Sequence, residues 1–144
     1  MKEFVETRWM GQMTFEGSID GFPVRMDASP EHGGSSFGLK PKPMILLSLA
    51  GCTGMDVVSI LNKKRVVFND FRILINAEMT ETHPKYYHKI HLIFQFTGEN
   101  FEGNEELYGK IKRSVELSSD NYCGVSAMLR KSCDISWEIQ LKNL

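Results

Sequence analysis

The sequence predicts an α+β fold in which mainly antiparallel sheets surround a long central helix, in the order βββ-α-ββ-α-α-β. Three observations predict it. Short stretches near the N-terminus alternate polar with apolar residues, a long apolar run fills the middle, and two further alternating stretches precede amphipathic segments and a last strand. The chain has 144 residues, the size of an ordinary domain, so we expect one domain over residues 1–144.

Residues 1–28 are expected to form three strands. The alternating stretches are Phe4–Met10, Met13–Ile19 and Phe22–Ala28. Asp20-Gly21 separates the last two, and this dipeptide is typical of a tight hairpin. Residues 29–42 are rich in glycine, serine and proline, which predicts a long loop, and long loops are often functional.

Residues 43–65 are expected to form the central helix. Pro43 suits the first helical position because its missing N–H is not needed there. The run ends in Asn-Lys-Lys-Arg, whose cations complement the helix dipole. Apolar residues occur nearly all round its first four turns, so we expect the helix to be buried at the centre of the structure.

Residues 69–144 are expected to supply a β-hairpin, two helices and a last strand. The hairpin strands are Phe71–Met79 and His88–Phe96, each with apolar residues on one face. Asn104–Ser119 has the pattern of an amphipathic helix, and a short second helix is expected to start near Cys123. The last strand carries alternating apolar residues, Ile135, Trp137, Ile139 and Leu141.

The composition excludes several classes of function. The net charge is −1 with scattered basic residues, which does not favour nucleic acid as a partner. The start resembles neither a signal peptide nor a transit peptide. The sequence has no run of about 18 uncharged apolar residues, so no membrane span is expected. We therefore expect a cytoplasmic protein with reduced thiols. Its three cysteines fit no C-x-x-C pattern, so neither a metal nor a cofactor is expected.

The central helix carries a polar seam, and positions four apart on a helix share a face. Its members are Ser48, Cys52, Asp56 and Ser59. Such a seam is either a satisfied core network or the wall of a site. Gly51 and Gly54 flank the cysteine at a cost of about 1 kcal/mol each relative to alanine, which indicates close packing of another helix. Cys52 alone is compatible with simple space filling.

Cys123 adds a second thiol where the short helix is expected to begin. Backbone N–H groups at a helix start stabilise a thiolate. If this thiol meets Cys52, one sulfur can attack a peroxide and become a sulfenic acid, and the other can then close a disulfide. The alternative is a small residue at a helix entry. Cys133 is expected to be a strand-edge residue, and His88 and His91 point to opposite faces, which disfavours a shared metal.

Two motifs together resemble the OsmC/Ohr family over nearly the whole chain. They are Pro-x-Pro-Met-Ile-Leu-Leu-x-Leu-Ala-Gly-Cys at 41–52 and Cys-Gly-Val-Ser at 123–126. The resemblance implies an intertwined homodimer that reduces organic hydroperoxides, with an external dithiol, for example dihydrolipoamide, as reductant. It also implies that Cys52 attacks and Cys123 resolves. The segment GCTGMDVVSIL resembles a branch distinct from the best-studied peroxidases.

The resemblance also implies a catalytic arginine, and Arg25 in Phe-Pro-Val-Arg is the matching residue. The alternative for Arg25 is an exposed strand residue. Peroxidases of the family place a glutamate at the start of the central helix, where this chain has Lys42 and Pro43. That departure motivates a second hypothesis, an OsmC-like redox-sensing or apolar small-molecule-binding protein without efficient peroxidase turnover. If the cysteines only pack, they should lie beyond disulfide range.

Overall fold

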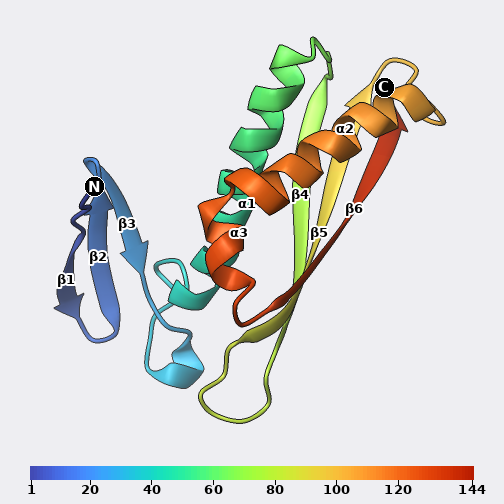
Figure 1. Cartoon of the computed structure of the whole chain (residues 1–144). Helices are drawn as coiled ribbons and strands as arrows, with labels where there is room; N and C mark the ends of the chain where they lie inside the picture. The colour runs from blue at the N-terminus through green and yellow to red at the C-terminus, as the bar shows by residue number, and fades with distance from the viewer. The chain divides into compact units, whose positions relative to one another are not determined.

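The computed structural model describes residues 1–144 (Figure 1). Its elements are β1 (Glu6–Gly11), β2 (Thr14–Ile19), β3 (Phe22–Met26), η1 (Pro30–His32), α1 (Pro41–Lys63), β4 (Asp70–Met79), β5 (Tyr87–Gly98), α2 (Glu105–Leu117), η2 (Ser118–Tyr122), α3 (Gly124–Leu129) and β6 (Asp134–Asn143). The strands form two three-stranded sheets, β1-β2-β3 and β4-β5-β6. The α+β class and the order of strands and helices are therefore confirmed.

The chain divides into two compact units, Met1–Leu47 and Ser48–Leu144. In the first unit β1, β2 and β3 form an antiparallel meander. Asp20 and Gly21 have φ angles of 50° and 82°, so the predicted hairpin is formed with both central residues in the left-handed region. The single domain over residues 1–144 stays a prediction.

Asp27 organises the loop after β3. Its carboxylate accepts hydrogen bonds from the backbone N–H groups of Ala28 at 2.7 Å and of Ser35 and Phe37 at 3.2 Å. Burial alone would raise the pKa of Asp27, but these N–H groups and the Thr14 side chain together lower it below its usual range. The predicted loop is thus an ordered turn held around one carboxylate.

The second unit is built on the sheet β4-β5-β6. β4 and β5 pair antiparallel from Asp70↔Thr97 to Met79↔Tyr87. β5 and β6 pair parallel, with Lys89 opposite Asp134. The parallel pair departs from the antiparallel expectation because α2 and α3 lie between these strands in the chain, and a crossover of that kind returns the chain in the same direction (Figure 1).

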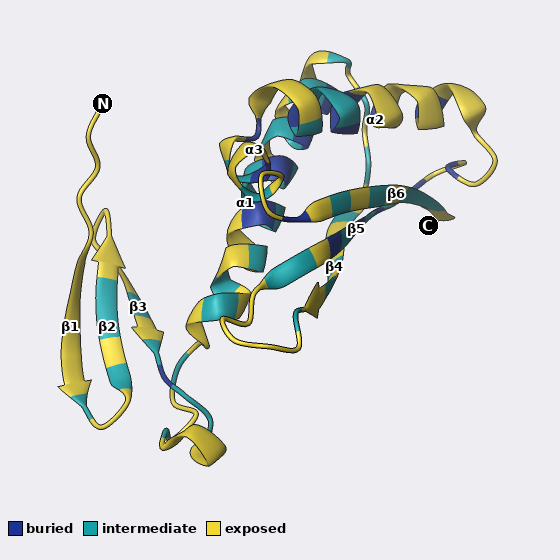
Figure 2. Ribbon diagram, turned by 60° about the horizontal axis from the view of Figure 1, so that its bottom comes forward, coloured by how far each residue is buried: buried dark blue, intermediate teal, exposed yellow.

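The core of this unit lies between the sheet and its helices, where α1, α2 and β5 carry buried segments (Figure 2). β5 alternates as predicted, with one face of apolar side chains buried, namely Ile90, Leu92, Phe94 and Phe96. The Phe96 ring stacks on that of Phe71 with centroids 4.1 Å apart. From α1 comes a stripe at every fourth position, namely Leu49, Thr53, Val57 and Leu61.

α1 differs from its prediction in bounds and in burial. It begins at Pro41, because prolines are tolerated throughout a first turn whose N–H groups have no helical partners, and it ends at Lys63. Only one stripe is buried, and Met55 remains 76% exposed. Burial on all sides is therefore wrong for the single chain. By length and composition α1 could cross a membrane, but its stripe packs in the unit, so we interpret it as a core helix.

Candidate redox site

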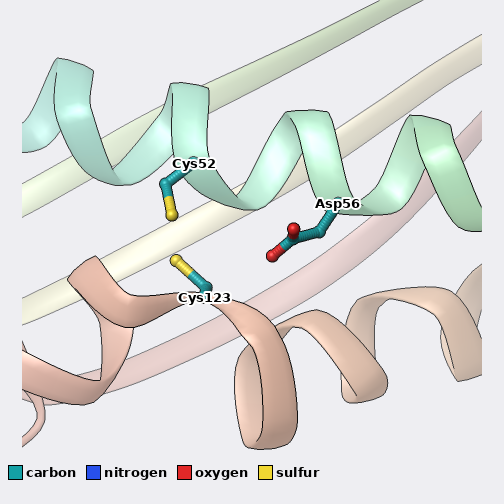
Figure 3. Close-up of side chains that lie close together, drawn as sticks. All are labelled: Cys52, Asp56 and Cys123. Carbon is teal, nitrogen blue, oxygen red and sulfur yellow. The ribbon is translucent and has the colours of Figure 1, made fainter. Parts of the chain in front are cut away.

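The structure brings Cys52 and Cys123 together although they lie about seventy residues apart in sequence. Cys52 projects from the middle of α1, and Cys123 stands at the N-cap of α3. Their sulfur atoms are within 4.8 Å of each other, and both thiols are free (Figure 3). Cys52 is half-buried and Cys123 is buried, so Cys52 is the more accessible sulfur.

Cys123 is placed by a change in helical winding. After α2 the chain makes a π-helical turn over Ser118–Tyr122, which is closed by a 2.8 Å hydrogen bond from the Cys123 N–H to the Ser118 carbonyl. The sulfur of Cys123 then caps α3 and accepts a hydrogen bond from the Ser126 N–H at 3.3 Å. The hydroxyl of Thr53 donates to the same sulfur at 3.4 Å. The prediction that a helix begins near Cys123 is confirmed.

The surroundings of Cys52 disfavour its thiolate form. Burial raises the pKa of the Cys52 thiol, and the neighbouring Cys123 and the Asp56 carboxylate raise it further. The backbone N–H of Val125, in the first turn of α3, donates to Cys52 and lowers the pKa in part. The net effect is upward, so this unit by itself favours the neutral thiol at Cys52.

Asp56 lies one helical turn beyond Cys52 and completes a cluster of three side chains. A carboxylate oxygen of Asp56 and the two sulfurs all lie within 4.8 Å of one another (Figure 3). The Ser118 hydroxyl donates to the carboxylate at 2.9 Å. Part of the predicted polar seam thus forms one wall of the site, whereas Ser59 is exposed.

A small cavity of about 10 Å³ shares two residues with the surroundings of Cys123. Its lining comprises Leu49, Thr53, Leu92, Phe94, Val115, Ser119, Ser126, Ile135 and Trp137. A space of this size holds about one water molecule. An organic molecule does not fit there.

The other sequence-selected residues are not members of this cluster. Arg25 belongs to β3 in the first unit, where its guanidinium pairs with Glu16 at 3.2 Å and the side chain is half exposed. Its catalytic role stays a prediction. Lys42 and Pro43 occupy the first turn of α1. Cys133 is buried just before β6, and its thiol donates to the Tyr87 carbonyl at 2.7 Å.

His91 forms a separate polar cluster on the sheet. Its Nδ1 lies 2.7 Å from the Ser136 hydroxyl, and its Nε2 lies 3.2 Å from the Glu138 carboxylate. Hydrogen bonds from Gln140 and from His91 lower the pKa of Glu138. These contacts between β5 and β6 are cross-strand side-chain pairs of the kind that stabilise a sheet.

Sequence reasoning missed the residues that support the two thiols. Ser118 reaches Asp56 across 62 positions, and Thr53 reaches Cys123 across 70. Neither contact has a local sequence signal. Ser126 is different, because a residue three positions after a helix N-cap regularly donates its N–H to the cap, and the Cys-Gly-Val-Ser motif has that spacing.

The chain belongs to the OsmC-like protein family, whose sequence model matches residues 32–138. Among its relatives is the protein YhfA of Escherichia coli K12, which is 33% identical over 132 residues that cover 90% of each chain. A solved structure described as a hypothetical protein from Aquifex aeolicus VF5 is 29% identical, covers 98% of both chains and superposes with a TM-score of 0.79.

The fold is also that of OhrB of Bacillus subtilis, an organic hydroperoxide resistance protein. That structure covers 97% of this chain and 98% of its own, with a TM-score of 0.63 and 14% identity. At this identity the likeness shows the fold alone. The family resemblance stated from the sequence is confirmed, and the two cysteines that it singled out lie near each other.

Proposed function

We propose that the protein reduces organic hydroperoxides with the Cys52/Cys123 pair, in detoxification or an oxidative-stress response. The observation that carries the proposal is the approach of the two sulfurs to within 4.8 Å inside an OsmC-like fold. The description of OhrB as an organic hydroperoxide resistance protein supports the substrate class. A pair of neighbouring thiols can accept the two electrons that must leave the protein when one peroxide is reduced.

The chemistry takes two steps on the protein. The Cys52 thiolate attacks the O–O bond, becomes a sulfenic acid and, with one proton, releases the alcohol. The Cys123 thiolate then attacks the sulfenic sulfur, forms the Cys52–Cys123 disulfide and, with one proton, releases water. An external dithiol exchanges with the disulfide, returns both thiols and leaves as its own disulfide.

The contacts around the sulfurs suit these roles. Cys52 is the more accessible of the two, as an attacking group must be. Cys123 accepts hydrogen bonds from Ser126 and Thr53, which hold its sulfur in place beside Cys52 for the resolving step. We propose that Arg25 holds the attacking thiolate and polarises the peroxide, which is the role implied by the family resemblance.

We further infer that the working form is a cytoplasmic homodimer. On α1, Met55 is 76% exposed, and outside the adjacent helix backbone no atom lies within 4 Å of the position that a Cβ at Gly51 would occupy. An apolar helix surface of this kind suits a second copy of the chain. We expect light scattering to give the mass of a dimer, and Met55→Lys to shift the equilibrium toward monomer. A monomeric wild type at micromolar concentration would contradict the inference.

The redox proposal is tested by counting thiols. Reduced protein should lose two of its three thiols after one equivalent of cumene hydroperoxide, and intact-mass analysis should show one internal disulfide joining Cys52 to Cys123. Cys133→Ser is the matched control, because it removes the third cysteine and should leave two reactive thiols. Retention of both thiols, with no Cys52–Cys123 disulfide, would refute the proposal.

Single variants separate the two roles. Cys52→Ser should not consume peroxide. Cys123→Ser should consume one equivalent and keep a sulfenic acid that dimedone traps at Cys52. Arg25→Ala should slow the attack but still form the disulfide. If dimedone instead labels Cys123 in Cys52→Ser, the roles of the two cysteines are reversed.

A second function, redox sensing or apolar ligand binding without efficient turnover, is favoured by the environment of Cys52. Burial, Cys123 and Asp56 raise the pKa of its thiol, which lowers the population of the nucleophilic form at neutral pH. A sensor would form the disulfide once and slowly, with little multiple turnover when a dithiol is added. Normal binding of an apolar ligand by Cys52→Ser would favour the binding role.

A further inference from the structure

Peroxide reduction uses the two sulfurs and leaves the third member of the cluster unexplained. Asp56 brings a carboxylate to within 4.8 Å of both cysteines (Figure 3). A carboxylate disfavours a nearby thiolate, so its presence does not help the attack. It takes part in none of the salt bridges of the structure. The carboxylate of Asp56 therefore has no lysine, arginine or histidine partner among these ion pairs.

The three donors come from two ordered elements. Cys52 and Asp56 are four positions apart on α1, which puts them on one face of the helix, and Cys123 faces them from the N-cap of α3. In a tetrahedral zinc site, Zn–S bonds of roughly 2.3 Å and Zn–O bonds of roughly 2.1 Å separate neighbouring donors by roughly 3.5 Å. Donors within 4.8 Å therefore need only a small contraction to share one ion.

Hydrogen bonds already orient two of the donors. The Ser118 hydroxyl donates to Oδ2 of Asp56 at 2.9 Å, which leaves the other carboxylate oxygen for a ligand bond. Ser126 and Thr53 donate to the Cys123 sulfur at 3.3 and 3.4 Å. Groups that hydrogen-bond to metal ligands fix their orientation and support their anionic form.

The donor set selects the class of metal. Two thiolates are soft ligands that favour Zn²⁺ over Mg²⁺ or Ca²⁺, and a divalent cation neutralises most of the charge of two thiolates and a carboxylate. Three protein ligands leave the fourth tetrahedral position to water. The sequence expectation of no metal rested on the absence of C-x-x-C, but here the donors meet only through the fold.

We propose that the reduced protein binds one Zn²⁺ through Cys52, Asp56 and Cys123, and that oxidation of the pair releases it. Binding does not depend on peroxide reduction, whereas release rests on the proposed function. In the release step the zinc-bound dithiolate, one hydroperoxide and two protons give the Cys52–Cys123 disulfide, free Zn²⁺, one alcohol and one water. The two electrons pass from the sulfurs to the peroxide, and zinc keeps its charge. Bound zinc thus protects the thiols until an oxidant removes them as ligands.

The test measures zinc binding by the reduced full-length protein. Calorimetry and competition with a chromogenic chelator give the affinity and the number of bound ions. We expect one Zn²⁺ per chain, and Cd²⁺ should give a thiolate-to-metal absorption band in the ultraviolet. Protein oxidised with diamide should not bind, which tests the site without any substitution. Equal binding by reduced and oxidised protein would overturn the proposal.

Variants identify the carboxylate ligand. Asp56→Asn should weaken zinc at least tenfold, and Ser118→Ala should weaken it by up to about tenfold, as expected for loss of a group that orients a ligand. Asp134→Asn removes a carboxylate outside the cluster, and Cys133→Ser removes the third thiol, so both should bind like wild type. Unchanged affinity in a folded Asp56→Asn protein would exclude Asp56 as a ligand. If the protein binds zinc but loses no thiols to peroxide, only the proposed function is contradicted. If it loses thiols to peroxide but binds no zinc, only the proposed metal site is contradicted.

Discussion

Replacing Asp56 by asparagine should make Cys52 more reactive in metal-free buffer. The change removes one negative charge within 4.8 Å of the sulfur but keeps an oxygen that can accept the Ser118 hydrogen bond. Two unit charges 4.8 Å apart repel each other by about 0.9 kcal/mol in water, and by more in less polar surroundings. This energy corresponds to about a fourfold change in an equilibrium constant.

The expected result is therefore a thiolate population at Cys52 at least about fourfold larger at neutral pH. Burial raises the pKa of Cys52 more than Asp56 does, so the variant should remain less reactive than an exposed cysteine. The assay is the rate of iodoacetamide alkylation at Cys52 against pH, followed by mass spectrometry, with a chelator present. Cys123→Ser serves as the background so that only one thiol of the pair reports.

Asp134→Asn is the matched control, since its carboxylate lies outside the cluster, and it should leave the rate unchanged. An alkylation profile of Asp56→Asn that stays the same, or moves to higher pH, would refute the electrostatic reasoning. The same substitution should weaken zinc binding, so one variant moves two readouts in opposite directions. A simple loss of folding would reduce metal binding but expose Cys133 as well, which the mass spectra would reveal.

Three further changes test the fold and the second thiol. Thr53→Val keeps the shape of a buried side chain but removes the hydroxyl that donates to Cys123, so disulfide closure measured by stopped flow should slow by about fivefold, the effect of roughly 1 kcal/mol. Leu61→Ala removes a side chain with no exposed surface and should lower the free energy of unfolding by about 2–5 kcal/mol in urea titrations. Glu138→Gln should flatten the loss of stability below about pH 4.3, because a carboxyl whose pKa is lowered by folding stabilises the protein above its ordinary pKa and loses this contribution on acidification.

The elements of this chain were predictable where the signal is local. Alternation identified every strand, and Asp20-Gly21 identified a turn whose two residues both have positive φ angles. The position of Cys123 at a helix start followed from its neighbours as well. The parallel pairing of β5 with β6 could not be predicted from local sequence signals, because it depends on where the chain returns after α2 and α3.

The burial of α1 shows a different limit. Apolar residues nearly all round a helix predict that every face is covered, but they do not say by what. In this chain the stripe that contains Leu49 and Val57 packs in the second unit, while Met55 stays exposed. The sequence pattern thus marks apolar surface on every side of the helix, of which the second unit itself buries one stripe.

The candidate site was only half accessible from sequence. A spacing of about seventy residues cannot show that two thiols meet. Cys52 and Cys123 were therefore selected by the family resemblance and not by their spacing. The role of Asp56 needed the fold, because its oxygen approaches both sulfurs only once α3 faces α1. The π-helical turn at Ser118–Tyr122 has no marker in the sequence, although it places the backbone of Cys123.

Ser118 connects the parts of this site in a way that explains its chemistry. Its carbonyl accepts the N–H of Cys123, and its hydroxyl holds the carboxylate of Asp56. A single buried residue therefore fixes both the second thiol and the anion that opposes ionisation of the first. This hydrogen bond holds the carboxylate beside the sulfurs, where its charge raises the pKa of Cys52. The proposed roles of Arg25 and of zinc share one physical basis, because each supplies a cation that offsets the repulsion between carboxylate and thiolate. We expect the guanidinium to favour turnover and the zinc ion to favour protection of the reduced pair.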